Sequence, residues 1–460
     1  METENILGFI RGNNNDIPFC YRNGRLILMH SSIESWKEEK NRFYSFFDSD
    51  GDGDEEWIGE KYFDGICQDE SKIRFCVSDL ASQDNGYYEY DVKFFVKFRG
   101  MEHDKINVIE LKGREIDYFL DVGTVNKFIS DEKSIGTTIE RSEPFKLCSY
   151  TFEETDVAVV AFYGCEIRQR SQVPLKKTSG LRIELSKMQD EEFVLNICHH
   201  FMNLFQYLSF RRNVEISGVK IFNYGESKKK PQGYGTIHRE LELTGCVDDD
   251  KEIRDKMIKY RYVKEGMDKL LELISKDKIY LEHIVSSLET RNSYRPDRII
   301  MIFAAFEREF NDIYGVDCER SQEYTSVKAE VVEMLLKKAD CFNGKKKKYY
   351  KSIAKSVDKL DNSYGKRIEI AIKDCYEELK VMIAHYYKND MENKALGIGA
   401  RMNAVRNNMV HANMGWELKP INIADLDVLQ DLIYAMRLKQ IGINTEAVRG
   451  GLAQLRGFTI

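Results

Sequence analysis

The residues best suited to chemistry lie in one short segment near the C-terminal end of the chain, 400–413, which reads ARMNAVRNNMVHAN. Arg406, Asn407 and His411 supply a guanidinium, an amide and an imidazole. A histidine titrates near neutral pH and can move a proton to or from a ribose 2′-hydroxyl or a leaving oxygen. An arginine stays charged and binds non-bridging phosphate oxygens with paired donors. The combination suits phosphodiester chemistry and contains no ligand for a hard metal ion.

Helical spacing separates these side chains from an apolar stripe, which we expect to face a core. The stripe consists of Ile398, Met402, Val405 and Met409. Asn403, Asn407 and His411 follow at four-residue steps on the opposite side, with Arg406 at the rim. A helix predicted over 398–411 therefore presents a histidine, a guanidinium and two amides away from its own apolar face.

The string Arg406-Asn407-x-x-x-His411 resembles the R-N-x3-H motif of HEPN (higher eukaryote and prokaryote nucleotide-binding) domains. These are α-helical bundles, often dimeric, and many are metal-independent ribonucleases. The resemblance implies that Arg406 and His411 are catalytic, with Asn407 as their polar neighbour. It implies RNA cleavage that leaves a 2′,3′-cyclic phosphate and a 5′-hydroxyl, without a cofactor.

A second helix carries part of the resemblance. The aromatic-rich segment that contains Phe306-Glu307 is similar to the first helix of HEPN domains in ApeA-type anti-phage defence proteins. This implies that Glu307 supports the site, that the substrate is tRNA or another cellular RNA, and that a phage-derived trigger acts through the N-terminal half. The implied role is defence by abortive infection.

Two residue patterns point to partners. Arg406 and His411 diverge by about 140° on a straight helix, so we expect a second copy of the chain to complete the site, with Asn403 as a supporting residue at the two-fold axis. Lys345–Lys348 precede Tyr349 and form a weaker candidate for holding an RNA backbone and stacking a base. A solvated loop and helix start is the alternative for that run.

Two rival functions stay open at this point. A HEPN-like module could bind a nucleotide or an RNA end without cutting, although binding alone needs no titrating histidine. A regulatory protein could use the helical domain only to dimerise. The string from Arg25 to His30 repeats the Arg–His spacing, but it lies in a strand-like run and lacks the asparagine, so we set it aside.

The period of the apolar residues predicts an α+β chain: a β-rich N-terminal domain, followed by an all-α helical bundle. The resemblance implies that this bundle is HEPN-like. We expect a β-rich regulatory domain over 1–240, a helical connector over 248–292, a helical nuclease domain over 293–445 and a tail over 446–460. A helix from Glu191 to Phe210 should pack on the sheet. Pro296 and Gly315 should begin and end the first nuclease helix.

Composition fits a cytoplasmic protein without membrane spans. The 460 residues include no apolar run of membrane-spanning length, and the N-terminus has no secretory pattern. The ten cysteines form no C-x-x-C pair, and Cys198-His199-His200 lacks a distant partner with ligand spacing, so we predict no metal site. The net charge of −7 divides unevenly: 293–460 holds 27 Lys+Arg and 23 Asp+Glu, a balance of +4.

Overall fold

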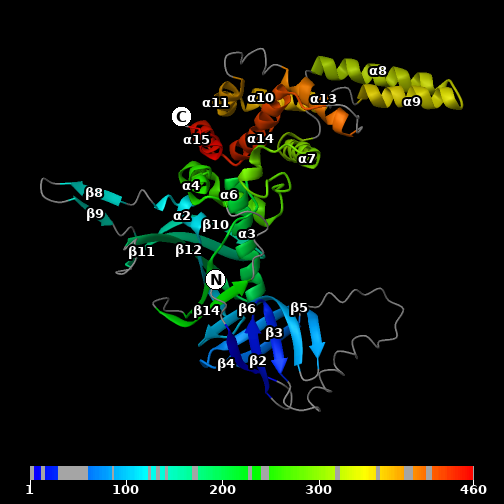
Figure 1. Cartoon of the computed structure of the whole chain (residues 1–460). Coiled ribbons are helices and arrows are strands. Elements are labelled where there is room, and N and C mark those ends of the chain that lie inside the picture. Colours follow the sequence, from blue (N-terminus) through cyan, green and yellow to red (C-terminus); the bar gives the residue numbers. More distant parts are fainter. Residues whose placement is uncertain are drawn as a thin grey trace, which may run out of the picture. The chain divides into compact units, whose positions relative to one another are not determined.

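The computed structural model describes residues 5–11, 16–29, 61–84, 87–122, 126–130, 135–139, 143–167, 175–225, 230–239, 248–315, 322–358, 363–387, 397–410 and 417–458. The fold is α+β, with strands in the N-terminal half and helices in the C-terminal part (Figure 1). The chain divides into two compact units, 1–202 with 214–244, and 203–213 with 245–460. The expected connector and tail thus belong to the helical unit.

The first unit contains a closed barrel, because its strands follow the order β6-β3-β2-β1-β4-β5 and β5 pairs again with β6. The barrel strands are β1 (Ile6–Ile10), β2 (Ile17–Arg22), β3 (Arg25–Met29), β4 (Lys61–Cys67), β5 (Lys72–Asp84) and β6 (Tyr87–Arg99). Asn23 and Gly24 join β2 to β3 with φ values of 50° and 78°, the conformation that a two-residue hairpin turn requires. The barrel core includes Phe19, Leu28 and Phe75.

The same sheet continues from β6 in the order β14-β13-β7-β12-β11-β10. These strands are β7 (Ile106–Lys112), β10 (Phe145–Phe152), β11 (Thr155–Ile167), β12 (Leu175–Gln189), β13 (Gly218–Tyr224) and β14 (Pro231–Arg239). A separate pair, β8 (Asn126–Ser130) with β9 (Ile135–Ile139), and the short helix α2 (Arg114–Phe119) complete the described elements before α3 (Glu191–Ser209). The expected helix over 191–210 is confirmed, and its apolar stripe from Phe193 to Leu208 is buried.

The helical unit is built around α14, in which every side chain from Val428 to Leu438 is buried. Its helices are α4 (Asp250–Asp255), α5 (Tyr260–Val263), α6 (Met267–Ser275), α7 (Pro296–Tyr314), α8 (Gln322–Asp340), α9 (Lys345–Asp358), α10 (Tyr364–Asp374), α11 (Tyr376–Tyr387), α13 (Ile398–Val410), α14 (Pro420–Gln440) and α15 (Thr445–Arg456). Single 3₁₀ turns lie at Lys264–Gly266 and Glu289–Asn292. Pro296 and Gly315 bound α7 as expected.

Residues 364–387 form two helices, because Cys375 leaves the helical conformation between α10 and α11. One expectation about the helices is wrong. The segment 446–460, expected as a tail because of Gly450-Gly451, forms α15 over most of its length. Both glycines are buried there, and a side chain at Gly450 would collide with the ring of Tyr262. Close helix packing, rather than a chain break, accounts for Gly450.

Candidate active site

The site begins at a close crossing of α10 and α13. A methyl group at Gly365 would lie 2.6 Å from the backbone oxygen of Gly399, and a methyl group at Gly399 would collide with the backbone oxygen of Gly365. The two helix backbones therefore touch, which only glycine permits at these positions. Ile398, Met402 and Val405 of α13 are buried, as the apolar stripe predicts, whereas Met409 is only half-buried.

Tyr364 stands at the start of α10 and joins it to α7. Its ring makes edge contacts with Phe303 and Phe306, with centroids 5.4 and 5.3 Å apart, and its hydroxyl donates to the carbonyl oxygen of Phe303 at 3.3 Å. Burial raises the pKa of this phenol well above its ordinary value. Tyr364 therefore stays protonated and serves as a rigid platform rather than as a base.

Arg406 lies on that platform. Its guanidinium carbon is 4.9 Å from the centre of the Tyr364 ring, and its Nη2 donates to Glu307 at 3.4 Å. The Arg406 side chain keeps 35% of its surface exposed. An arginine has five N–H donors, and these two contacts with described residues engage few of them. The arrangement fixes the direction of the guanidinium and leaves donors that a phosphate can reach.

Glu307 is shared between two arginines. Its second carboxylate oxygen accepts from Arg367 of α10 at 3.4 Å, and Arg367 also donates to the side-chain oxygen of Asn311 at 3.2 Å. Arg367 is nearly buried, with its guanidinium 5.8 Å from the Phe310 ring centre. We did not predict Arg367 as a site residue. Sixty residues separate it from Glu307 in the sequence, and no local pattern joins them.

The structure brings some predicted residues together and not others. Glu307 and Arg406 are in contact, whereas Asn407 is exposed and Asn403 is half-buried beside the α10–α13 crossing. Asn403 thus faces α10 in part, not solvent alone. His411 lies outside the described residues, which end in this helix at Val410.

The lysine run expected as a candidate RNA contact begins α9. Lys347 forms an ion pair with Asp340 at 3.1 Å, and the Lys346 ammonium lies 4.9 Å from the Phe342 ring centre. Lys345, Lys348 and Tyr349 are exposed. The run is therefore the first turn of a helix, and only part of it is engaged in packing.

Other charged clusters of the helical unit hold helices together. Arg437 of α14 pairs with Glu309 at 2.6 Å and with Asp312 at 2.8 Å, and its side chain is fully buried. Arg401 binds Asp425 through two donors at 2.6 and 2.7 Å. Among the described residues, no group of three His, Cys, Asp or Glu is arranged to hold a metal ion.

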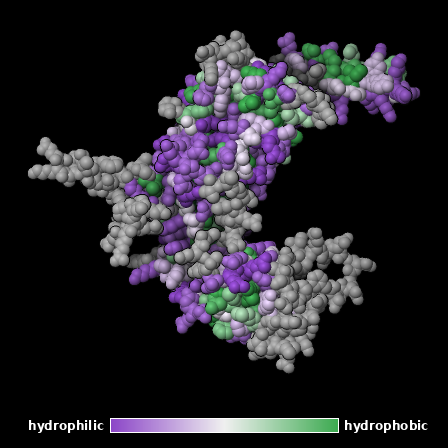
Figure 2. All heavy atoms as spheres, in the orientation of Figure 1, coloured by the Kyte–Doolittle hydropathy of each residue, from purple (hydrophilic) through white to green (hydrophobic). Residues whose placement is uncertain are grey.

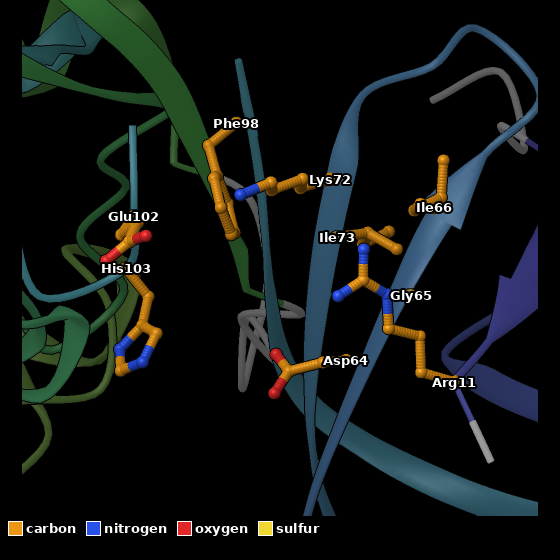
Figure 3. A pocket seen from close by; sticks show the side chains of 9 residues that line it. All are labelled: Arg11, Asp64, Gly65, Ile66, Lys72, Ile73, Phe98, Glu102 and His103. Atoms are coloured by element: carbon orange, nitrogen blue, oxygen red, sulfur yellow. The ribbon is translucent and has the colours of Figure 1, made fainter. Parts of the chain in front are cut away.

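The first unit has a pocket of its own at the barrel. Figure 3 shows its lining, with Glu102 and His103 on one side and Arg11 and Asp64 on the other. Its volume is about 240 Å³. Nδ1 of His103 lies 3.1 Å from a carboxylate oxygen of the buried Glu191, and this contact fixes the orientation of the imidazole. The volume suffices for a small polar ligand, and the lining carries both positive and negative side chains, which do not indicate the class of ligand.

Comparison of the chain with known protein families, with curated proteins and with solved structures finds no match. In the part of the chain that the structure describes, no helix has the length and apolar character needed to cross a membrane. Any assignment of function therefore rests on the site itself.

Proposed function

We propose that the helical unit is a metal-independent endoribonuclease of the HEPN type, acting in the cytoplasm. The observation that carries the proposal is Arg406: a guanidinium oriented by Glu307 and Tyr364, about one-third exposed, and five residues before a histidine. Three helices fix this one charged group. A group that binds a reacting phosphate must be held in a fixed orientation, and the contacts with Glu307 and Tyr364 hold Arg406 in this way.

In the proposed reaction, the ribose 2′-hydroxyl attacks the adjacent phosphorus and the bond to the 5′-oxygen breaks. The products are a 2′,3′-cyclic phosphate and a 5′-hydroxyl. His411 takes the proton from the 2′-hydroxyl or gives one to the leaving oxygen. Arg406 binds the non-bridging oxygens, whose charge grows in the transition state. Glu307 is a positioning residue that acts through Arg406, with Asn407 beside the histidine.

The proposal includes a second copy of the chain, so that two Arg406–His411 sets share one cleft. The five-residue spacing of Arg406 and His411 would put them on different faces of a straight helix, and a two-fold contact along α13 would bring two such faces together. Specific activity should then fall on dilution together with the mass measured by light scattering. A strictly monomeric species that cuts RNA with undiminished specific activity would refute the shared cleft.

The biological setting follows from the resemblance alone. We propose a role in phage defence by abortive infection, with a phage-derived trigger acting on the β-rich unit. The barrel pocket is the proposed binding place for such a trigger.

An assay of cleavage and binding on the same RNA separates this function from its two rivals. The wild type should both bind and cut, whereas His411→Ala should bind and not cut. A module that only binds RNA would bind without cutting in either form. A protein that only dimerises would do neither, and either of these outcomes in the wild type would overturn the proposal.

A further inference from the structure

The helices α8 and α9 form an antiparallel hairpin and pack mainly against each other, as the two side-by-side helices of Figure 1 show. Ala339 and Ala354 are the only fully buried residues described in the two helices. Nearly all other side chains of the pair face solvent at least in part. The hairpin is thus unusually free to present side chains to a partner.

The charge of α9 is strongly one-sided. Its fourteen residues include six lysines and one acidic residue, Asp358, which pairs with Lys328 at 3.5 Å. The whole chain, by contrast, has a net charge of −7. Five exposed lysines of α9 form no ion pair with any residue that the structure describes: Lys345, Lys346, Lys348, Lys351 and Lys355. Clustered cations without counter-ions attract a polyanion.

The positions of these lysines on α9 follow from helical spacing. Lys348, Lys351 and Lys355 recur at steps of three and four, so they lie along one stripe about 10 Å long. Tyr349 lies one turn after Lys345 and about 100° around the helix from Lys348, and it keeps 63% of its surface exposed. An exposed aromatic ring among lysines can stack an unpaired base while the ammonium groups bind the phosphates around it.

We propose that the solvent face of α9 binds unpaired RNA, with its phosphates on the lysine stripe and a base on Tyr349. This proposal rests on the proposed function, because it makes α9 the part of the helical unit that captures the substrate. Lysines bind phosphate without reading base edges, so the face does not select a sequence, whereas stacking on Tyr349 requires an unpaired base.

A protein partner is the competing occupant. Exposed apolar side chains on the same hairpin include Val327, Met334 and Ile353, with exposed fractions of 55%, 59% and 50%. Figure 2 shows hydrophobic residues gathered part-way along the hairpin between hydrophilic ones. A second copy seated on α9, however, would bring its own lysines close to these lysines. The one-sided charge therefore favours a polyanion on α9.

The test is the salt dependence of binding to a single-stranded 2′-O-methyl RNA, measured by fluorescence anisotropy. This probe lacks the 2′-hydroxyl nucleophile, so binding is separated from cleavage. Each lysine–phosphate contact contributes about 0.7 to the slope of log affinity against log salt. The triple variant Lys348→Gln, Lys351→Gln, Lys355→Gln should therefore lower the slope by about 2. Tyr349→Ala should weaken binding about fivefold or more.

The matched control changes the net charge by the same amount elsewhere in the helical unit. Lys276, Lys366 and Lys380 already pair with Glu272, Glu369 and Glu377 at 2.5, 2.9 and 2.6 Å. Their triple change to glutamine should leave the slope unchanged. Equal losses in both triple variants would overturn the proposal, because binding would then follow net charge alone.

Two further outcomes are decisive. A change of mass in light scattering after substitution of the α9 lysines, with RNA binding unaltered, would make the hairpin a protein interface and overturn the proposal. Lysine-dependent binding by a protein that cuts no RNA would support RNA docking on α9 and refute the proposed nuclease function. The two proposals can therefore fail separately.

Discussion

The crossing of α10 and α13 gives the sharpest stability prediction. Replacing Gly365 by alanine puts a methyl group 2.6 Å from the backbone oxygen of Gly399, where real methyl contacts essentially never occur. The obstacle is backbone, so no side chain can rotate away. Overpacking of this kind costs about 1–3 kcal/mol, while alanine gains about 0.5–1 kcal/mol over glycine within a helix. The net expectation is a loss of up to about 2.5 kcal/mol.

Gly451 of α15 provides the matched control. It is also a buried helical glycine, but the nearest atom to its added methyl group is 3.4 Å away, on the side chain of Ile258. Gly451→Ala should therefore stabilise the protein by up to about 1 kcal/mol. Urea unfolding followed by far-ultraviolet circular dichroism measures both changes. A Gly365→Ala variant as stable as Gly451→Ala would show that the two helix backbones do not touch.

The same variant tests how Arg406 is positioned. Tyr364 precedes Gly365 in α10, so moving α10 away from α13 also draws the tyrosine platform from beneath the guanidinium. Under the proposed function, Gly365→Ala should lose RNA cleavage at a temperature where it remains folded, and Gly451→Ala should not.

Three further predictions concern buried charge and metal dependence. Burial lowers the pKa of His283 to about 3, below the value of about 6.5 in the unfolded chain. The unfolded chain therefore binds a proton at this residue before the folded protein does, and the free energy of unfolding falls as the pH drops below about 6.5. The loss between about pH 7 and pH 5 is about 2 kcal/mol, and His283→Leu should reduce the difference in unfolding free energy between those pH values by that amount. Arg437→Met leaves Glu309 buried without its partner at 2.6 Å and should cost about 3–5 kcal/mol in urea unfolding. RNA cleavage should persist in EDTA, and a DNA of the same sequence should stay intact because it lacks the 2′-hydroxyl; strict Mg²⁺ dependence would contradict the mechanism.

Local sequence patterns predict the elements of the site well. Proline at the first position of α7 and glycine after its last residue give the bounds of that helix, because both act within one turn. The apolar stripe of α13 correctly indicates that Met402 and Val405 are buried and that Arg406 lies at the rim. Such patterns are enough to predict helix bounds and side-chain burial where these depend on a single helix.

Local sequence patterns do not predict contacts between helices that are far apart in the sequence. Arg367 shares Glu307 with Arg406, yet nothing near Arg367 in the sequence distinguishes it from other arginines on helix faces. The pair Gly450-Gly451 reads as a break, but it packs against α5 inside a helix. Helix propensity is a weak preference, and tertiary packing overrides it at such positions.

The central claim is that Arg406 and His411 cut RNA, and a cleavage assay with end-group analysis tests it most directly. Arg295→Ala is the matched control, since Arg295 is a surface arginine of the same unit whose side chain is 78% exposed. The wild type and the control should release 5′-hydroxyl and 2′,3′-cyclic phosphate ends at equal rates.

Arg406→Ala should cut about 10²–10³-fold more slowly, and His411→Ala about 10²–10⁴-fold more slowly. Both variants should stay folded, with Arg406→Ala losing about 1 kcal/mol from its contacts with Glu307 and Tyr364. Wild-type protein that leaves RNA intact in its dimeric form, or an Arg406→Ala variant that cuts as fast as Arg295→Ala, would contradict the account.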